Sequence, residues 1–160
     1  MKVGAIAYKK TKKGVKICLV TSRRHTGTLT LPKGHAKQNE VMTKAALREL
    51  FEEAGVVGKI IKKSRPILFS SKSDEVDDVL YFFVKIKQTC TFWPEQHIRD
   101  RIFLTLDEAI EKRTSKATKK ILRMLVKNNS LVRRISQNRS HSAQPVFLHK
   151  KKFWKKSFTR

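Results

Sequence analysis

The chain has 160 residues and carries 37 lysines and arginines against 13 aspartates and glutamates, which gives a formal net charge of +24 at pH 7. This length fits one domain with a real hydrophobic core, and such a charge attracts polyanions such as nucleotides, inositol phosphates, nucleic acid or anionic lipid surfaces. The N-terminal segment is too short and too broken by lysine for a signal peptide, and no run could span a membrane, so we expect a cytoplasmic protein.

The first third of the chain reads as two strands, a loop and a helix. Residues 2–10 and 15–23 are strand-like, and the short link between them has the length of a hairpin. A polar loop then leads through a short apolar strand into a Pro-Lys-Gly turn at 32–34. The run 41–54 is rich in Ala, Leu and Glu and predicts a helix, and Gly55 follows where a helix stop is expected.

The rest of the body is predicted to contain further strands and then two helices. Residues 79–88 form the strongest strand of the chain, because they are aromatic and partly alternating. The other segments are strand material interrupted near Pro66 at 56–71, an acidic loop at 71–78, a loop leading into a strand at 93–106, and helices at 107–112 and 116–127.

The C-terminal part of the chain differs in composition from the rest. From Lys127 onward it contains no acidic residue and ten lysines and arginines. We therefore predict a body at 1–128 and a basic extension at 129–160. The extension is interpreted as a solubilising terminus, with weak contact to nucleic acid or to an anionic surface as the alternative.

Acidic residues gather at one place in this basic chain. On a helix, Glu49, Glu52 and Glu53 stand at i, i+3 and i+4 and project from one side, and Arg48 can hold Glu52 in position. The ordinary interpretation is the solvent face of an amphipathic helix. The alternative is a cation site, because three converging carboxylates suit a hard ion such as Mg²⁺. A metal there would bridge phosphate oxygens and activate a water for attack at phosphorus.

The wider spacing around this helix resembles the Nudix box. Gly34, then Glu40 after five residues, then the run 48–56 after seven more, occupy the fixed positions of that motif. The resemblance implies an α/β protein of the α+β type with the Nudix fold, a mixed β-sheet sandwiched between helices with a loop-helix-loop catalytic motif. It also implies a hydrolase that depends on Mg²⁺ or Mn²⁺ and cleaves a nucleoside diphosphate linked to another group.

The resemblance carries over residue by residue. Glu49, Glu52 and Glu53 match the metal-binding glutamates, and Arg48 matches the arginine that orients a glutamate through a salt bridge. Glu52 or Glu53 is the first choice for the general base. Gly34 and Gly55 match the glycines that shape the loops, and Glu40 matches a glutamate whose role varies among members. Carboxylates on later loops are the other candidates for the base: Glu75, Asp77, Asp78 and Glu95.

The flanks of the box resemble one branch of the family, the diphosphoinositol polyphosphate and diadenosine polyphosphate phosphohydrolases. The similar segments are 20–35 before the box and 93–103 after it, and the resemblance extends over about 3–125. One departure is that Thr28 and Thr30 stand where members of the branch often have an aromatic residue, so ring stacking is not implied there.

Basic residues on both flanks favour a substrate with many phosphates. We predict phosphate contacts for Arg23, Lys33, Arg99 and Arg101, with solvated loop charges as the alternative. The predicted function is hydrolysis of diphosphoinositol polyphosphates or dinucleoside polyphosphates by a protein that is a monomer or a dimer. The alternatives are a nucleoside triphosphate or ADP-ribose pyrophosphatase, and an RNA 5′-end pyrophosphohydrolase or RNA-associated protein that uses the basic extension.

Overall fold

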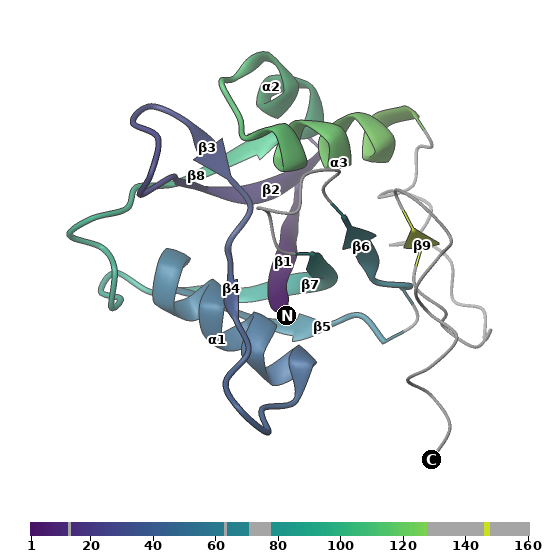
Figure 1. The fold of residues 1–160 in the computed structure, drawn as a ribbon. Coiled ribbons are helices and arrows are strands. Elements are labelled where there is room, and N and C mark those ends of the chain that lie inside the picture. Colours follow the sequence, from purple (N-terminus) through teal and green to yellow (C-terminus); the bar gives the residue numbers. More distant parts are fainter. Residues whose placement is uncertain (13, 63, 71–77, 128–145, 148–160) are drawn as a thin grey trace.

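A mixed β-sheet lies between helices, as the sequence predicted (Figure 1). The computed structural model describes residues 1–12, 14–62, 64–70, 78–127 and 146–147. Helix α1 (Met42–Ala54) covers one face of the sheet, and helices α2 (Leu106–Glu111) and α3 (Lys116–Lys127) cover the other. Among the described residues, no helix is long and apolar enough to cross a membrane.

The sheet is built around two parallel strands, β1 and β7, and its other body strands pair antiparallel. Its strand order is β3-β2-β1-β7-β6-β9, with β4 on β1, β5 on β7 and β8 on β2. The strands that the structure describes are β1 (Lys2–Thr11), β2 (Gly14–Thr21), β3 (Leu29–Thr30), β4 (Lys33–His35), β5 (Val56–Ile60), β6 (Ile67–Phe69), β7 (Val79–Thr89), β8 (Arg101–Thr105) and β9 (Val146–Phe147).

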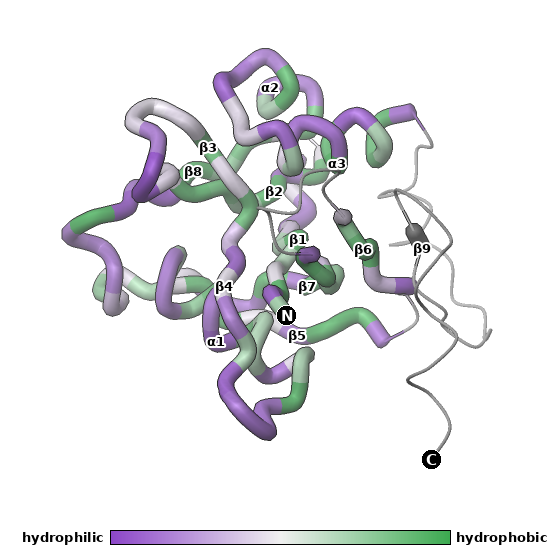
Figure 2. Tube along the Cα trace, viewed as in Figure 1, coloured by the Kyte–Doolittle hydropathy of each residue, from purple (hydrophilic) through white to green (hydrophobic). Residues whose placement is uncertain are grey.

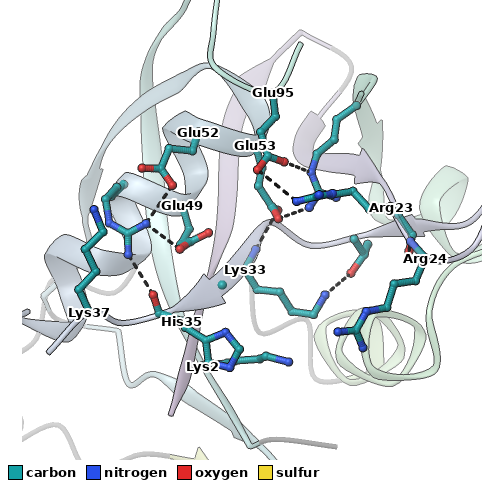
Figure 3. A pocket seen from close by; sticks show the side chains of 15 residues that line it. Lys2, Arg23, Arg24, Lys33, His35, Lys37, Glu49, Glu52, Glu53 and Glu95 are labelled. Atoms are coloured by element: carbon teal, nitrogen blue, oxygen red, sulfur yellow. Dashed lines mark hydrogen bonds and ion pairs between the residues drawn. The ribbon is translucent and has the colours of Figure 1, made fainter. Parts of the chain in front are cut away.

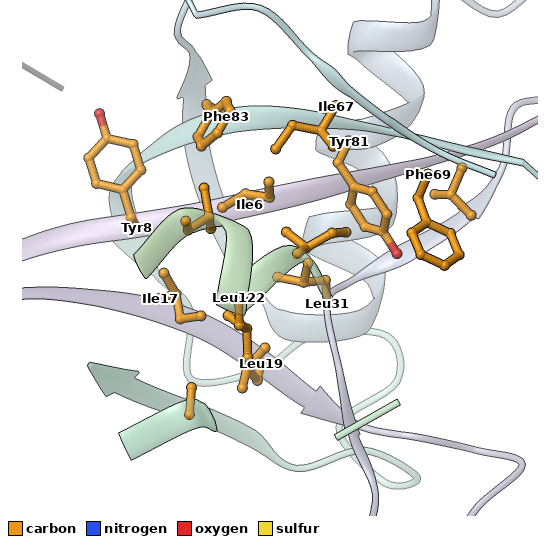
Figure 4. Packing of buried hydrophobic residues seen from close by; sticks show 14 of the residues in the cluster. Ile6, Tyr8, Ile17, Leu19, Leu31, Ile67, Phe69, Tyr81, Phe83 and Leu122 are labelled. Atoms are coloured by element: carbon orange, nitrogen blue, oxygen red, sulfur yellow. The ribbon is translucent and has the colours of Figure 1, made fainter. Parts of the chain in front are cut away.

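Successive side chains of β1 point to opposite faces of the sheet and contribute to a hydrophobic core on each face. Ile6 and Tyr8 point to the side of α3, in the larger cluster that Figure 4 shows. Ala5 and Ala7 point to the side of α1 and pack with Leu50 and other buried side chains. In Figure 2 much of the central sheet is correspondingly hydrophobic, while many residues of the outer loops are hydrophilic. The small alanines let α1 pack closely on the sheet.

The end of α1 is set by Gly55, as predicted. Gly55 adopts φ 58° and ψ 34°, a left-handed conformation, and its N–H donates to the Phe51 carbonyl at 2.8 Å. A side chain on Gly55 would also collide with the Trp93 ring, which covers this turn. Glycine is therefore required both by the backbone conformation and by the close approach of the ring.

Two segments differ from the sequence expectation. The predicted Pro-Lys-Gly turn is instead the start of β4, which pairs antiparallel with β1 through Val3 and Gly34. In the basic extension, β9 pairs parallel with β6, so this dipeptide joins the sheet at its edge. The rest of the extension, and the acidic loop apart from Asp78, lie outside the described residues.

Candidate active site

A cavity of about 850 Å³ opens beside the acidic side of α1, and most of the predicted site residues line it (Figure 3). In Figure 3, Glu49 and Glu52 lie to one side, Arg23 and Arg24 to the other, and Lys33 between them. The predicted residues that line it are Arg23, Lys33, Gly34, Arg48, Glu49, Glu52, Glu53 and Arg99. The other lining residues are Lys2, Ser22, Arg24, Thr30, His35, Lys37 and Glu95.

Arg48 is the centre of the acidic side of the cavity. Its guanidinium donates two hydrogen bonds of 2.8 Å each to the Glu40 carboxylate, one of 2.7 Å to Glu49 and one of 2.9 Å to Glu52. A further bond of 3.0 Å reaches the carbonyl of His35 on β4. The predicted orienting arginine thus contacts two glutamates of the helix and ties them to β4 and to the loop that precedes α1.

Glu40 anchors this arrangement from outside the cavity. Besides the hydrogen bonds from Arg48, its carboxylate accepts one from the Lys37 N–H at 2.9 Å. The hydrogen bonds from Arg48, followed by the one from Lys37, lower the pKa of Glu40 to about 2. The residue with a variable role in the motif is therefore a support for Arg48 in this chain.

Glu53 is the buried glutamate of the set, with 5% of its surface exposed. One oxygen accepts the backbone N–H of Lys33 at 3.1 Å, and the other pairs with Arg99. Burial raises the pKa of Glu53 to about 7, because the loss of water outweighs the opposing effects of Arg99 and Lys33. Burial also lowers the pKa of the Lys33 ammonium, which donates to the Thr30 hydroxyl at 3.1 Å.

The donor set fits a hard divalent cation in its chemistry. Glu49, Glu52 and Glu53 all line the cavity, and carboxylate oxygens are ligands of Mg²⁺ and Mn²⁺. At Gly34, a β-carbon would overlap the Glu49 carboxylate, so the missing side chain makes room for that carboxylate. Within the described residues, no three acidic, histidine or cysteine side chains form a ready-made metal cluster, because these glutamates are turned toward Arg48 and Arg99.

The cationic side of the cavity is larger than the sequence suggested. Arg23 and Lys33 line it as predicted, and Lys2, Arg24 and Lys37 join them. Lys2 is far from the box in sequence and reaches the cavity only because β1 pairs with β4, which sets Lys2 opposite His35. Local sequence carries no signal of that pairing.

Arg101, for which a phosphate contact was predicted, does not line the cavity. Its guanidinium donates to the carbonyls of Ala54 at 2.7 Å, Cys90 at 3.2 Å and Gly55 at 3.3 Å, and lies over the Trp93 ring at 4.6 Å. A cation on the last carbonyls of a helix satisfies their lone pairs and the helix dipole. The geometry therefore favours a structural cap of α1 over the predicted phosphate contact.

Of the later-loop carboxylates considered as a base, Glu95 lines the cavity and Asp78 does not. Glu75 and Asp77 lie outside the described residues. His97, which belongs to the same basic stretch as Arg99, is exposed and is not part of the lining.

Comparison with known proteins identifies the same region of the chain. The family model of the NUDIX domain matches residues 1–125. Among curated proteins, the chain is 36% identical over 115 residues to Nudix hydrolase 18, mitochondrial, of Arabidopsis thaliana, covering 71% of this chain and 65% of that one. It is 35% identical over 118 residues to Nudix hydrolase 4 of the same plant, covering 68% and 56%. The chain thus spans less than two thirds of the length of these relatives.

Solved structures share the fold at low sequence identity. A C. elegans Ap4A hydrolase in a binary complex aligns with a TM-score of 0.65 and 20% identity, over 81% of this chain and 98% of that chain. The NUDIX domain of Shewanella oneidensis NrtR, complexed with ADP ribose, aligns with a TM-score of 0.61 and 16% identity, over 81% and 87%. At these identities the likeness extends to the fold alone.

Proposed function

The chain belongs to the Nudix family, and on that basis we propose that it is a metal-dependent pyrophosphohydrolase that cleaves a phosphoanhydride by water attack at phosphorus. The observation that carries this proposal is a cavity that is lined both by three glutamates of α1 and by a group of cations. The glutamates suit a divalent metal, and the cations suit the phosphates of the substrate.

Each side chain of the cavity has a role in this proposal. Glu49, Glu52 and Glu53 would hold Mg²⁺ or Mn²⁺, which supplies Lewis-acid activation of a water and charge neutralisation when bound. Arg48 orients Glu49 and Glu52 through its hydrogen bonds. Glu53 is the first choice for the general base, because burial raises the pKa of its carboxyl above the ordinary value, and Glu52, with a side chain that is 34% exposed, is the alternative.

The composition of the cavity favours diphosphoinositol polyphosphates over dinucleoside polyphosphates. Among the residues that the structure describes, its lining includes no Phe, Tyr, Trp or aliphatic side chain apart from the stems of the charged residues, and its aromatic ring is that of His35. A nucleobase is usually held by stacking, for which this lining offers the His35 ring and arginine guanidiniums but no larger aromatic or aliphatic surface. The cations that it offers instead match a compact substrate with many phosphates.

A hydrolysis panel with the purified full chain tests the proposal. The substrates are diphosphoinositol pentakisphosphate, diadenosine polyphosphates, nucleoside triphosphates, ADP-ribose and triphosphorylated RNA, each with Mg²⁺, with Mn²⁺ and with a chelator. We expect metal-dependent hydrolysis, monitored by separation of the products, with the highest kcat/KM on the diphosphoinositol substrate. The variant Glu53→Gln should lose at least about a hundredfold in kcat while remaining folded.

Other outcomes of the panel would replace parts of the proposal. A higher kcat/KM on a dinucleoside or nucleoside substrate would overturn the substrate assignment and keep the hydrolase. No metal-dependent turnover on any substrate would overturn the hydrolase itself. Preference for triphosphorylated RNA would favour the RNA 5′-end activity.

We also propose that residues 1–128 carry the activity and that 129–160 are an extension. The family model ends at residue 125, which supports this division. Ending the chain after Asn129 removes the acid-free segment together with β9, a two-residue strand at the sheet edge. The shortened chain should keep kcat within about threefold, with a lower kcat/KM at low salt because part of the electrostatic attraction of the substrate is gone.

A further inference from the structure

Arg99 is fully engaged by the protein, although it lies at the substrate cavity. Its side chain is 9% exposed. The Nη2 group pairs with Glu53, Nε donates to Glu95 at 2.5 Å, and Nη1 donates to the carbonyl of Thr21 at 2.8 Å. Each guanidinium nitrogen therefore already points at a protein oxygen, which leaves little of the group for a phosphate.

The loop that carries Arg99 is fixed to the end of α1. The Glu95 N–H donates to the Glu52 carbonyl at 3.0 Å, and the Cys90 N–H donates to the Gly55 carbonyl at 2.7 Å. The Arg99 N–H closes a turn on the Glu95 carbonyl at 3.0 Å. Because the loop follows the helix end in this way, the distance from Arg99 to the helix side chains is set by backbone hydrogen bonds.

Glu53 is held from two directions. Arg99 reaches its Oε1, and the Lys33 N–H of β4 reaches its Oε2. The carboxylate is buried, so losing a charged partner would leave it poorly compensated and free to adopt another rotamer. Of the two contacts, the one from Arg99 carries the charge and is therefore the stronger.

We propose that Arg99 is a positioning residue that holds Glu53 in its working orientation, and that Glu95 in turn holds the guanidinium of Arg99. The inference rests on the proposed function, since it assigns a task within that site. It replaces the phosphate contact that the sequence suggested for Arg99. The effect of Glu95 is indirect and smaller, because Arg99 Nη1 keeps its hydrogen bond to the Thr21 carbonyl when the contact to Glu95 is lost.

The change that isolates position from charge is Arg99→Lys. Lysine keeps the positive charge, but a single ammonium cannot replace a planar fork that reaches Glu53, Glu95 and Thr21 together. A residue that merely binds phosphate would tolerate this exchange in kcat, whereas a residue that orients a glutamate would not. Arg123→Lys is the matched control, because Arg123 is exposed on α3 and outside the cavity lining.

Two readouts on the full-length chain test the proposal. The first is kcat and KM on the best substrate of the panel, and the second is the Kd of Mn²⁺ without substrate, followed by electron paramagnetic resonance. We expect Arg99→Lys to lower kcat by about 10–100-fold with KM within about twofold, and to weaken Mn²⁺ binding by a factor of about 3–10. Glu95→Gln should give the same pattern at smaller size, and Arg123→Lys should match the wild type.

The outcomes separate the possible roles of Arg99. A rise in KM at unchanged kcat would overturn the proposal and restore the phosphate contact. Wild-type kcat and Mn²⁺ affinity in Arg99→Lys would also overturn it. If no substrate of the panel is hydrolysed, the proposed function fails, and the Mn²⁺ Kd alone then decides whether Arg99 positions Glu53. Thermal melts of all variants identify unfolding, and Glu95→Gln, which removes the charge that holds the Arg99 guanidinium, tests the proposal should Arg99→Lys not fold.

Discussion

Gly34→Ala should damage activity far more than stability. Gly34 lies in β4, paired with Val3 of β1, so the backbone cannot retreat from the helix. A β-carbon at this position would overlap the carboxylate of Glu49, which is the flexible end of its side chain. We therefore expect Glu49 to swing away and to lose its 2.7 Å contact with Arg48, while the strand stays in place.

The size of each effect follows from that displacement. The Arg48–Glu49 pair is partly exposed, so its loss costs about 0.2–1 kcal/mol of unfolding free energy. For a chain of this length the melting temperature then falls by about 0.4–4 °C. Activity should fall at least about tenfold, because one of the three carboxylates proposed to hold the metal has left its place.

A double variant makes the test sharp. In a Glu49→Ala background the obstacle is gone, so Gly34→Ala should cost no further stability, and the two changes should be non-additive in urea unfolding. Two results would refute this reasoning. Near wild-type turnover in Gly34→Ala would mean that activity does not require the Glu49 carboxylate to lie beside Gly34. A stability cost that persists in the Glu49→Ala background would mean that the strain comes from the backbone.

Three further predictions concern the surroundings of the cavity. Glu40→Gln should lower the free energy of unfolding above about pH 4.5, and this loss should disappear as the pH falls toward about 2, because the folded-state pKa of Glu40 is depressed. Urea unfolding of both proteins across pH measures the difference in unfolding free energy. A difference that persists at about pH 2 would contradict the prediction. Lys33→Ala and Arg23→Ala should mainly raise KM, and more for substrates with more phosphates, so equal effects on all substrates in initial-rate assays would count against phosphate contact. Thr118→Val removes the hydroxyl that accepts the Leu31 N–H at 3.1 Å and should cost about 1–3 kcal/mol in chemical denaturation, with an unchanged midpoint as the contrary result.

Local pattern was enough to predict most elements of the fold. The helix predicted at 116–127 has the same bounds in the structure, because Ile121, Leu122 and Leu125 recur on one side and pack in the core. Helix α1 begins one residue later than predicted, at Met42, and ends at the predicted glycine stop. These elements are specified by residues that are close together in the sequence.

What local pattern missed depends on long-range pairing. Pro32 and Gly34 suggested a turn, yet the segment 33–35 is a strand because β1 lies beside it. The same pairing brings Lys2 to the cavity. Arg99 and Arg101 are two residues apart, Arg99 in the loop before β8 and Arg101 at the start of β8, and one pairs with Glu53 while the other caps α1. Both residues are arginines of the same stretch, so only their positions in the folded chain distinguish their roles.

The parallel pairing of β1 with β7 determines when the protein can fold as it is synthesised. Lys2 pairs with Val79 and Tyr8 with Lys85, so the centre of the sheet joins the start of the chain to a strand made much later. At ribosomal rates, the interval between the synthesis of the two strands is roughly 4–16 s, during which β1 lacks its central partner. Such pairings slow folding and leave an apolar strand open to aggregation. Lys2, Lys9 and Lys10, at the ends of β1, repel other copies of the nascent chain in that interval.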